Sequence, residues 1–240
     1  MPKTKPPILY IHGFRGSPAG NAEIVAILRK NFEVYSPKIP PTGARNKLET
    51  YDADSYAKFI ADYIQEHKLR RPVLVGHSMG SIIAAATAER YPNLINKKLI
   101  LVSPITSKVP KPIALLQPTI VFLPKRLISY VTTRFLFVPR QRTLFKKALA
   151  LTNKSASSFT SRRDLRKSAS FASKYSLNDF DLKQDLLLIA GEKDRLTSEE
   201  TNKEFAQSHF AKLRLIDDSG HLINYERPTV VAKLIEDFIK

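Results

Sequence analysis

The chain has 240 residues and no cysteine, which excludes disulfide bonds and thiolate metal sites and is compatible with a reducing compartment. It carries no apolar run of about 18 residues, as a membrane helix needs, and no signal-peptide pattern, so we expect a cytoplasmic protein. Its net charge of +17 is concentrated between positions 104 and 178, where fifteen Lys or Arg stand against one acid, Asp164.

Apolar, strand-like runs alternate along the chain with segments of helical periodicity. The expected strands cover residues 6–14, 32–37, 72–76, 97–103, 185–191 and 212–217. The expected helices cover residues 21–30, 53–68 and 81–91, then one opened by Thr197 with Glu200 three residues later, and a last one from Pro228 to the end. This alternation predicts an α/β fold, a doubly wound and mostly parallel sheet of about six strands with helices on both faces.

One long segment, residues 104–178, interrupts the alternation. It is rich in proline, basic, partly apolar and too long for a connecting loop. We therefore expect an inserted, mostly helical cap at 104–178 and a core domain made of 1–103 and 179–240. Bulky apolar residues of this segment favour an acyl pocket under a basic rim, although they also fit simple packing of the cap onto the sheet: Ile113, Leu115, Leu116, Ile120, Val121, Phe122, Leu123, Phe135, Leu136 and Phe137.

A serine flanked by glycines lies between an expected buried strand and a helix, in the sequence GHSMG. A sharp turn there exposes the hydroxyl of Ser78 at the edge of the sheet, and it brings strand and helix so close that Gly76 and Gly80 are needed. A serine is a good nucleophile only when a base activates it. We therefore expect a base and an orienting acid at the ends of later strands.

Two later loops offer these partners. Asp194 follows the strand 185–191, and His221 follows the strand 212–217. Other carboxylates stand nearby in the sequence, namely Glu192, Asp217 and Asp218. Along the chain these residues come in the order serine, aspartate, histidine, which is also the order in enzymes whose nucleophile lies on such a strand-to-helix turn.

These residues belong to four short motifs: HGF at 12–14, GHSMG at 76–80, GEKD at 191–194, and SGH at 219–221 followed by ERP at 226–228. In this combination the chain resembles the α/β-hydrolase superfamily, specifically a serine esterase-like member with an inserted cap. The resemblance implies that Ser78 attacks a carbonyl carbon, His221 transfers the proton and Asp194 orients the imidazole. It also implies an oxyanion hole formed by the backbone N–H groups of Phe14 and Met79, and it implies no cofactor.

The remaining histidines and one arginine need a role. His77 directly precedes the nucleophile and His12 belongs to the HGF motif, yet no carboxylate cluster completes a metal shell, so we expect both to brace the loops and expect no metal. His67 and His209 lie late in expected helices, which suits a structural role. Arg15 follows the HGF motif at the pocket mouth and is a candidate for binding a substrate carboxylate or phosphate.

The function that these expectations favour is cleavage of a carboxylic ester through an acyl-enzyme, on a lipophilic or anionic small molecule. A thioesterase, an acyltransferase or a lyase-type relative uses the same three residues, and a non-catalytic binding module with a basic surface is the alternative from another class. The basic cap is compatible with peripheral contact to an anionic membrane. Nucleic-acid binding is not expected, because no recognised module accompanies the charge.

Overall fold

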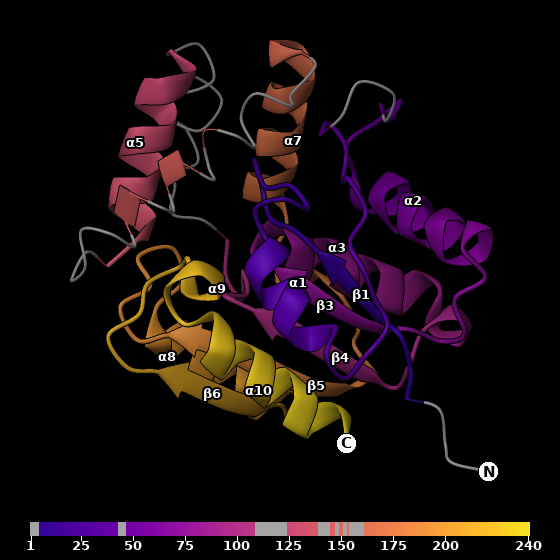
Figure 1. The fold of residues 1–240 in the computed structure, drawn as a ribbon. Helices are drawn as coiled ribbons and strands as arrows, with labels where there is room; N and C mark the ends of the chain where they lie inside the picture. Colours follow the sequence, from indigo (N-terminus) through magenta and orange to yellow (C-terminus); the bar gives the residue numbers. More distant parts are fainter. Residues whose placement is uncertain are drawn as a thin grey trace.

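The computed structural model describes residues 5–42, 47–108, 124–138, 145–146, 149–150, 153 and 161–240. Within these residues a six-stranded sheet has the strand order β2-β1-β3-β4-β5-β6 (Figure 1). Every neighbouring pair is parallel. The predicted α/β fold with a doubly wound parallel sheet is therefore confirmed.

The strands follow the apolar runs of the sequence. Their bounds are β1 Ile8–Ile11, β2 Val34–Tyr35, β3 Val73–His77, β4 Lys98–Val102, β5 Asp185–Gly191 and β6 Lys212–Ile216. The strands β1 and β3 are buried along their whole length, as expected for central strands with helices on both faces. The edge strand β2 is shorter than the sequence predicts, because only Val34 and Tyr35 pair with β1.

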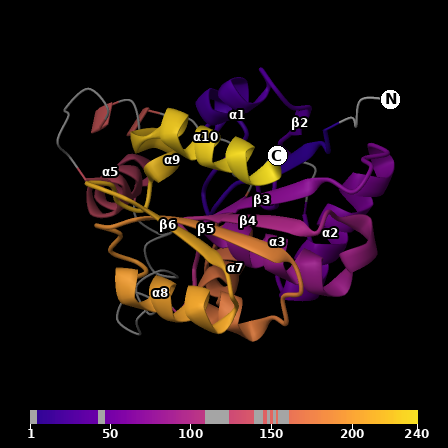
Figure 2. The ribbon, with the colours of Figure 1, turned by 90° about the horizontal axis from the view of Figure 1, so that it is seen from below.

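Helices cover both faces of this sheet. The bounds are α1 Ala22–Leu28, α2 Ala53–Glu66, α3 Met79–Arg90, α5 Lys125–Leu136, α7 Arg162–Lys174, α8 Glu199–Ser208, α9 Ile223–Glu226 and α10 Pro228–Ile239, with 3-10 turns η1 Pro92–Leu94 and η2 Leu177–Asp179. Figure 2 shows α1, α9 and α10 on one face and α2, α3, α7 and α8 on the other. Since a parallel sheet must be shielded on both sides, this arrangement gives the protein two apolar layers.

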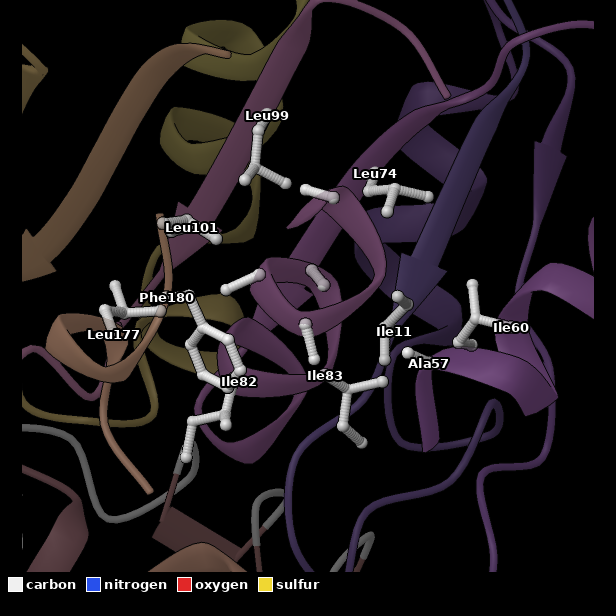
Figure 3. Close-up of a cluster of buried hydrophobic side chains, with 14 of the residues drawn as sticks. Ile11, Ala57, Ile60, Leu74, Ile82, Ile83, Leu99, Leu101, Leu177 and Phe180 are labelled. Carbon is white, nitrogen blue, oxygen red and sulfur yellow. The ribbon is translucent and has the colours of Figure 1, made fainter. Parts of the chain in front are cut away.

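The larger apolar layer forms around α3. Every residue of α3 from Met79 to Ala88 is buried, and four of them are alanines that let the helix lie close to the strands. Ile82 and Ile83 of this helix pack among side chains from β1, β3, β4 and α2 (Figure 3). Tight packing on both sides of α3 holds its first residue in a fixed position at the end of β3.

The segment 104–178 lies between β4 and β5 in the chain, and its described elements α5 and α7 both stand above the sheet in the view of Figure 1. The helix α7 is joined to the core, because Phe171 packs on Tyr56 with ring centroids 4.6 Å apart and the Tyr56 hydroxyl is hydrogen-bonded to Ser168 Oγ over 3.1 Å. Of the apolar residues expected to form an acyl pocket, all those from 113 to 123 lie outside the described residues. No helix within the described ranges is long and apolar enough to span a bilayer.

The expected start of α8 is wrong by one residue. Ser198, rather than Thr197, caps this helix and accepts a hydrogen bond from the Thr201 amide. The hydroxyl of Thr197 is buried and donates to the carbonyl of Pro104 over 3.0 Å, and its amide faces Asp194. Thr197 is therefore engaged in buried tertiary contacts, and the exposed Ser198 caps the helix instead. The short helix α9 was not expected.

Candidate active site

Ser78 occupies a strained turn between β3 and α3. Its backbone has φ 54° and ψ −123°, a region that side chains rarely adopt, and its amide donates to the carbonyl of Val102 over 3.0 Å. A Cβ on Gly76 would lie 2.3 Å from the carbonyl oxygen of Gly80, and one on Gly80 would lie 2.2 Å from that of Ile11. The turn therefore requires both glycines, as the sequence predicts.

The structure brings the serine, the histidine and the aspartate into one hydrogen-bonded chain. The distance between Ser78 Oγ and His221 Nε2 is 2.7 Å, and that between His221 Nδ1 and Asp194 Oδ2 is also 2.7 Å. An ionised carboxylate only accepts, so Nδ1 carries the imidazole proton and donates to Asp194. The other ring nitrogen, Nε2, is then free to accept the proton of the Ser78 hydroxyl.

Asp194 is held as an acceptor by its surroundings. The Leu196 amide donates to Asp194 Oδ1 over 2.8 Å, and the Thr197 amide donates to the same oxygen over 3.4 Å. Burial by itself raises the pKa of this carboxyl, but the His221 ring and the two amides outweigh burial and hold the pKa below its usual value. The buried carboxyl therefore stays ionised beside the imidazole.

The competing carboxylates do not reach His221. Glu192 and Asp217 are exposed, and Asp218 forms a surface ion pair with Lys193, with its Oδ1 2.6 Å from Nζ. Of the acids that the sequence offers, the structure therefore places only Asp194 on the imidazole among its described residues.

His12 and His77 brace the loops around Ser78 through hydrogen bonds. The Ile39 amide donates to His12 Nε2 over 3.1 Å, so Nδ1 carries the proton and donates to the carbonyl of Gly13 over 3.0 Å. His77 Nε2 donates to the carbonyl of His221 over 3.2 Å. Burial lowers the pKa of His12 to about 4, and burial together with the neighbouring His221 ring lowers that of His77 to about 3. Both rings are therefore neutral near pH 7.

His67 and His209 end helices α2 and α8, and their rings stack on Tyr63 and Phe205, in agreement with the expected structural role. In the described part of the chain, no group of three or more His, Asp or Glu side chains is arranged to hold a metal ion.

The loop after β1 lies against the nucleophile. A Cβ on Gly13 would lie 2.9 Å from Ser78 Cβ, so the backbone of this loop passes directly beside the serine. The next residue, Phe14, lines the same cavity as Ser78, while Met79 contributes the first amide of α3. Neither of these two amides has a backbone acceptor among the described residues. Free N–H groups at a helix start favour negative charge beside them.

A cavity of about 100 Å³ opens over Ser78 and His221. The loop after β1 forms one wall with Phe14 and Arg15, and helix α5 forms another with Thr133 and Leu136. On this measure a single water needs roughly 10–15 Å³, so the cavity has room for several waters. The described part of the cavity therefore suits a small acyl or alcohol group.

Arg15 lies in this cavity wall with a left-handed backbone, φ 57°. Its side chain is buried, and Nη2 donates to Ser129 Oγ of α5 over 3.3 Å. Burial lowers its pKa to about 10, so it remains charged near pH 7.

Sequence reasoning gave no role to Glu226. Its buried carboxylate accepts a hydrogen bond from the Gly220 amide over 3.0 Å and another from the Val138 amide, so it joins the loop before His221 to the end of α5. Burial raises the pKa of Glu226 to about 7. The only sign of Glu226 in the sequence is that it begins the ERP motif after SGH. This motif singles out the residue but does not predict its contacts with the amides of Gly220 and Val138.

Comparison with known proteins agrees with this arrangement. The model of the alpha/beta hydrolase family matches residues 8–234. The chain is 26% identical to the uncharacterised hydrolase YugF of Bacillus subtilis, over 97% of this chain and 89% of that protein.

Two solved structures share the fold over almost the whole chain. The esterase EaEST of Exiguobacterium antarcticum has a TM-score of 0.84 at 17% identity and covers 98% of this chain and 92% of its own. The enol-lactonase of Burkholderia xenovorans LB400 has a TM-score of 0.83 at 18% identity, with 100% and 93% covered. The chain belongs to the alpha/beta hydrolase family, and hydrolase activity is the function that its relatives support.

Proposed function

We propose that the protein is a serine hydrolase that cleaves a carboxylic ester through an acyl-enzyme. The observation that supports this most strongly is the pair of 2.7 Å hydrogen bonds that join Ser78, His221 and Asp194 at the floor of a cavity. A serine hydroxyl hydrogen-bonded to an imidazole that a carboxylate orients is prepared for attack on a carbonyl carbon.

In the first half of the reaction, Ser78 Oγ attacks the ester carbonyl while His221 Nε2 takes the hydroxyl proton. Asp194 stabilises the imidazolium that forms, and the amides of Phe14 and Met79 donate to the oxyanion. The ester C–O bond then breaks, and His221 returns the proton to the departing alcohol. In the second half, water loses a proton to His221 and attacks the acyl group, and Ser78 recovers its proton as the acid leaves.

A thioesterase, an acyltransferase or a lyase-type activity remains the alternative, because each uses the same three side chains with another leaving group or acceptor. Similarity to an esterase and an enol-lactonase favours an oxygen ester, since the names of both proteins refer to ester bonds.

We further propose that residues 104–178 act as a cap that shapes the cavity and meets an anionic membrane surface. Helix α5 supplies cavity residues Thr133 and Leu136. Four of its apolar side chains are 38–51% exposed, namely Leu127, Tyr130, Val131 and Phe135. These lie at helical spacing within a segment that carries +14 of the net charge, and an apolar face flanked by basic residues is typical of a helix that binds at an interface.

The ester proposal is tested with a fluorophosphonate probe and a series of p-nitrophenyl esters of increasing acyl length. We expect labelling and turnover in the parent protein and neither in Ser78→Ala, with Ser208→Ala, a serine at the end of α8, as the matched control. Turnover that persists in Ser78→Ala contradicts the proposal. Because the described cavity is small, short acyl chains should be preferred.

A further inference from the structure

Arg15 is a buried cation without a counter-ion. Its side chain is 8% exposed, and all 22 acidic residues of the chain lie in the described part, yet none of them forms an ion pair with it. Burial is the sole influence on its pKa, so no nearby carboxylate offsets the loss of hydration. A buried charge without a partner is costly, and proteins retain such groups where a ligand completes them.

The guanidinium is also short of hydrogen bonds. It carries five N–H donors, but its one hydrogen bond within the described residues joins Nη2 to Ser129 Oγ at 3.3 Å. Both Nε and Nη1 are buried, and neither has a hydrogen-bond partner in the part of the chain that the structure describes. A carboxylate binds with two parallel hydrogen bonds either across Nη1 and Nη2 or across Nε and Nη2. Nη2 carries two N–H groups and gives one to Ser129, so one of these two edges keeps both of its donors.

The position of Arg15 relates this unused group to the reaction. It lines the same cavity as Ser78 and His221, and that cavity measures about 100 Å³. The residue directly before it, Phe14, carries one of the amides proposed for the oxyanion hole. One small molecule in this cavity can therefore place an anion on the guanidinium and a carbonyl on Ser78.

We propose that Arg15 binds a free carboxylate of the substrate, so that the enzyme acts on small esters that carry a second, ionised carboxyl group. The inference rests on the proposed function of Ser78. It adds a substrate class to that function: half-esters of short dicarboxylic acids rather than neutral esters. Arg15 acts here as a specificity-determining residue, and Ser129 holds the guanidinium toward the cavity.

A matched pair of esters tests this class. Monoethyl succinate and ethyl butyrate have the same ester and nearly the same length, and they differ in the terminal carboxylate. Hydrolysis is followed in a pH-stat at pH 7.5. We expect the parent protein to prefer monoethyl succinate in kcat/KM by about 100-fold, and we expect this ratio to fall to about one in Arg15→Met, mainly through KM.

Two further variants define the charge and the geometry that matter. Arg134→Met removes an exposed arginine from the neighbouring α5 and should keep the parent ratio. Arg15→Lys keeps the positive charge but loses the two parallel donors of the guanidinium, so its ratio of kcat/KM for the two esters should lie between those of the parent protein and Arg15→Met. This variant also provides the test if Arg15→Met does not fold. An equal loss of activity on both esters in the Arg15 variants, or no preference in the parent protein, overturns the inference.

Binding without turnover separates this inference from the proposed function. In calorimetry, succinate should bind the parent protein and Ser78→Ala, and binding should be lost in Arg15→Met. If fluorophosphonate labelling fails but succinate binding depends on Arg15, the role of Ser78 is wrong and the anion site stands. If labelling succeeds and succinate does not bind, or only inorganic phosphate does, the carboxylate inference is wrong and the hydrolase proposal stands.

Discussion

The backbone N–H of His221 donates a hydrogen bond to the carbonyl oxygen of Leu136 over 2.9 Å. Leu136 is the last residue of α5 and lines the cavity over Ser78. The loop that carries the imidazole is thus tied directly to the helix that shapes the cavity. A displacement of α5 would therefore also displace the ring that faces the nucleophile.

Gly220→Ala tests this connection. A Cβ at this position would lie 2.6 Å from the Leu136 carbonyl oxygen, so either the loop or α5 must shift. Because a shift of about 1 Å can cost about 100-fold in rate, we expect kcat to fall 10- to 100-fold, measured with a short p-nitrophenyl ester. Ser219→Ala, which adds no atom beside α5, should lower kcat much less. A stable Gly220→Ala protein with the parent kcat would show that the contact does not position His221.

Asp194→Asn tests the role of the carboxylate. The Asn amide can donate to Nδ1 of His221, which forces the proton onto Nε2 and leaves no acceptor for the Ser78 hydroxyl. We expect kcat to fall by about 10⁴-fold near pH 7 with the fold retained, by analogy with the same change in a serine protease. Asp218→Asn, which removes the charge that pairs with Lys193 at the surface, is the control and should change kcat less than twofold. A comparable loss in both variants would contradict a specific role for Asp194.

Glu226 predicts a pH dependence of stability. Its pKa is about 7 in the folded protein, raised by burial and by the charge of Asp194, while the amides of Gly220 and Val138 and the charge of Arg227 oppose the rise. Between pH 4.5, the ordinary pKa of a glutamate, and pH 7, the carboxyl of Glu226 is therefore protonated in the folded state but ionised in the unfolded state. The contribution to stability is therefore greatest below pH 4.5 and is lost as pH rises through 7.

The measurement is the free energy of unfolding at pH 6.5 and at pH 8.5 in the parent protein and in Glu226→Gln. The buried His12 and His77, whose folded pKa values are low, also titrate in the unfolded state, but they contribute equally to both proteins. Over this range the parent protein should lose on the order of 1 kcal/mol relative to Glu226→Gln, since each unit of pKa difference corresponds to about 1.4 kcal/mol. The exposed Glu204→Gln should keep the pH dependence of the parent protein. An unchanged pH dependence in Glu226→Gln would mean that another group titrates.

The exposed face of α5 predicts membrane binding. The parent protein should sediment with vesicles that contain about 30% anionic lipid and not with neutral vesicles, and 0.5 M salt should release much of it. The double substitution Leu127→Ser with Val131→Ser should weaken binding about tenfold, because two half-exposed apolar side chains no longer enter the interface. Val230→Ser, a similarly exposed residue of α10, is the control. Equal binding to both vesicle types would remove the membrane proposal.

The sequence could predict those features that depend on local pattern. Continuous apolar runs and helical periodicity predicted the parallel sheet, and the short motif around Ser78 predicted its turn, because a strand and a helix that meet so closely admit only Gly76 and Gly80. Local pattern was less reliable at element ends. Thr197 and Ser198 are both good helix caps by themselves, and the buried contact of Thr197 with Pro104 decided between them.

The amino-acid sequence by itself determined the α/β fold and the positions of a possible nucleophile, acid and base, because these depend on strand, turn and helix chemistry within a few residues. Only the tertiary structure decided which acid faces His221, that Arg15 is buried without a counter-ion, and that Glu226 joins the His221 loop to α5. The reason is physical: burial and pairing of charges depend on residues far apart in the chain, such as Arg15 and Ser129, whose meeting no local pattern encodes.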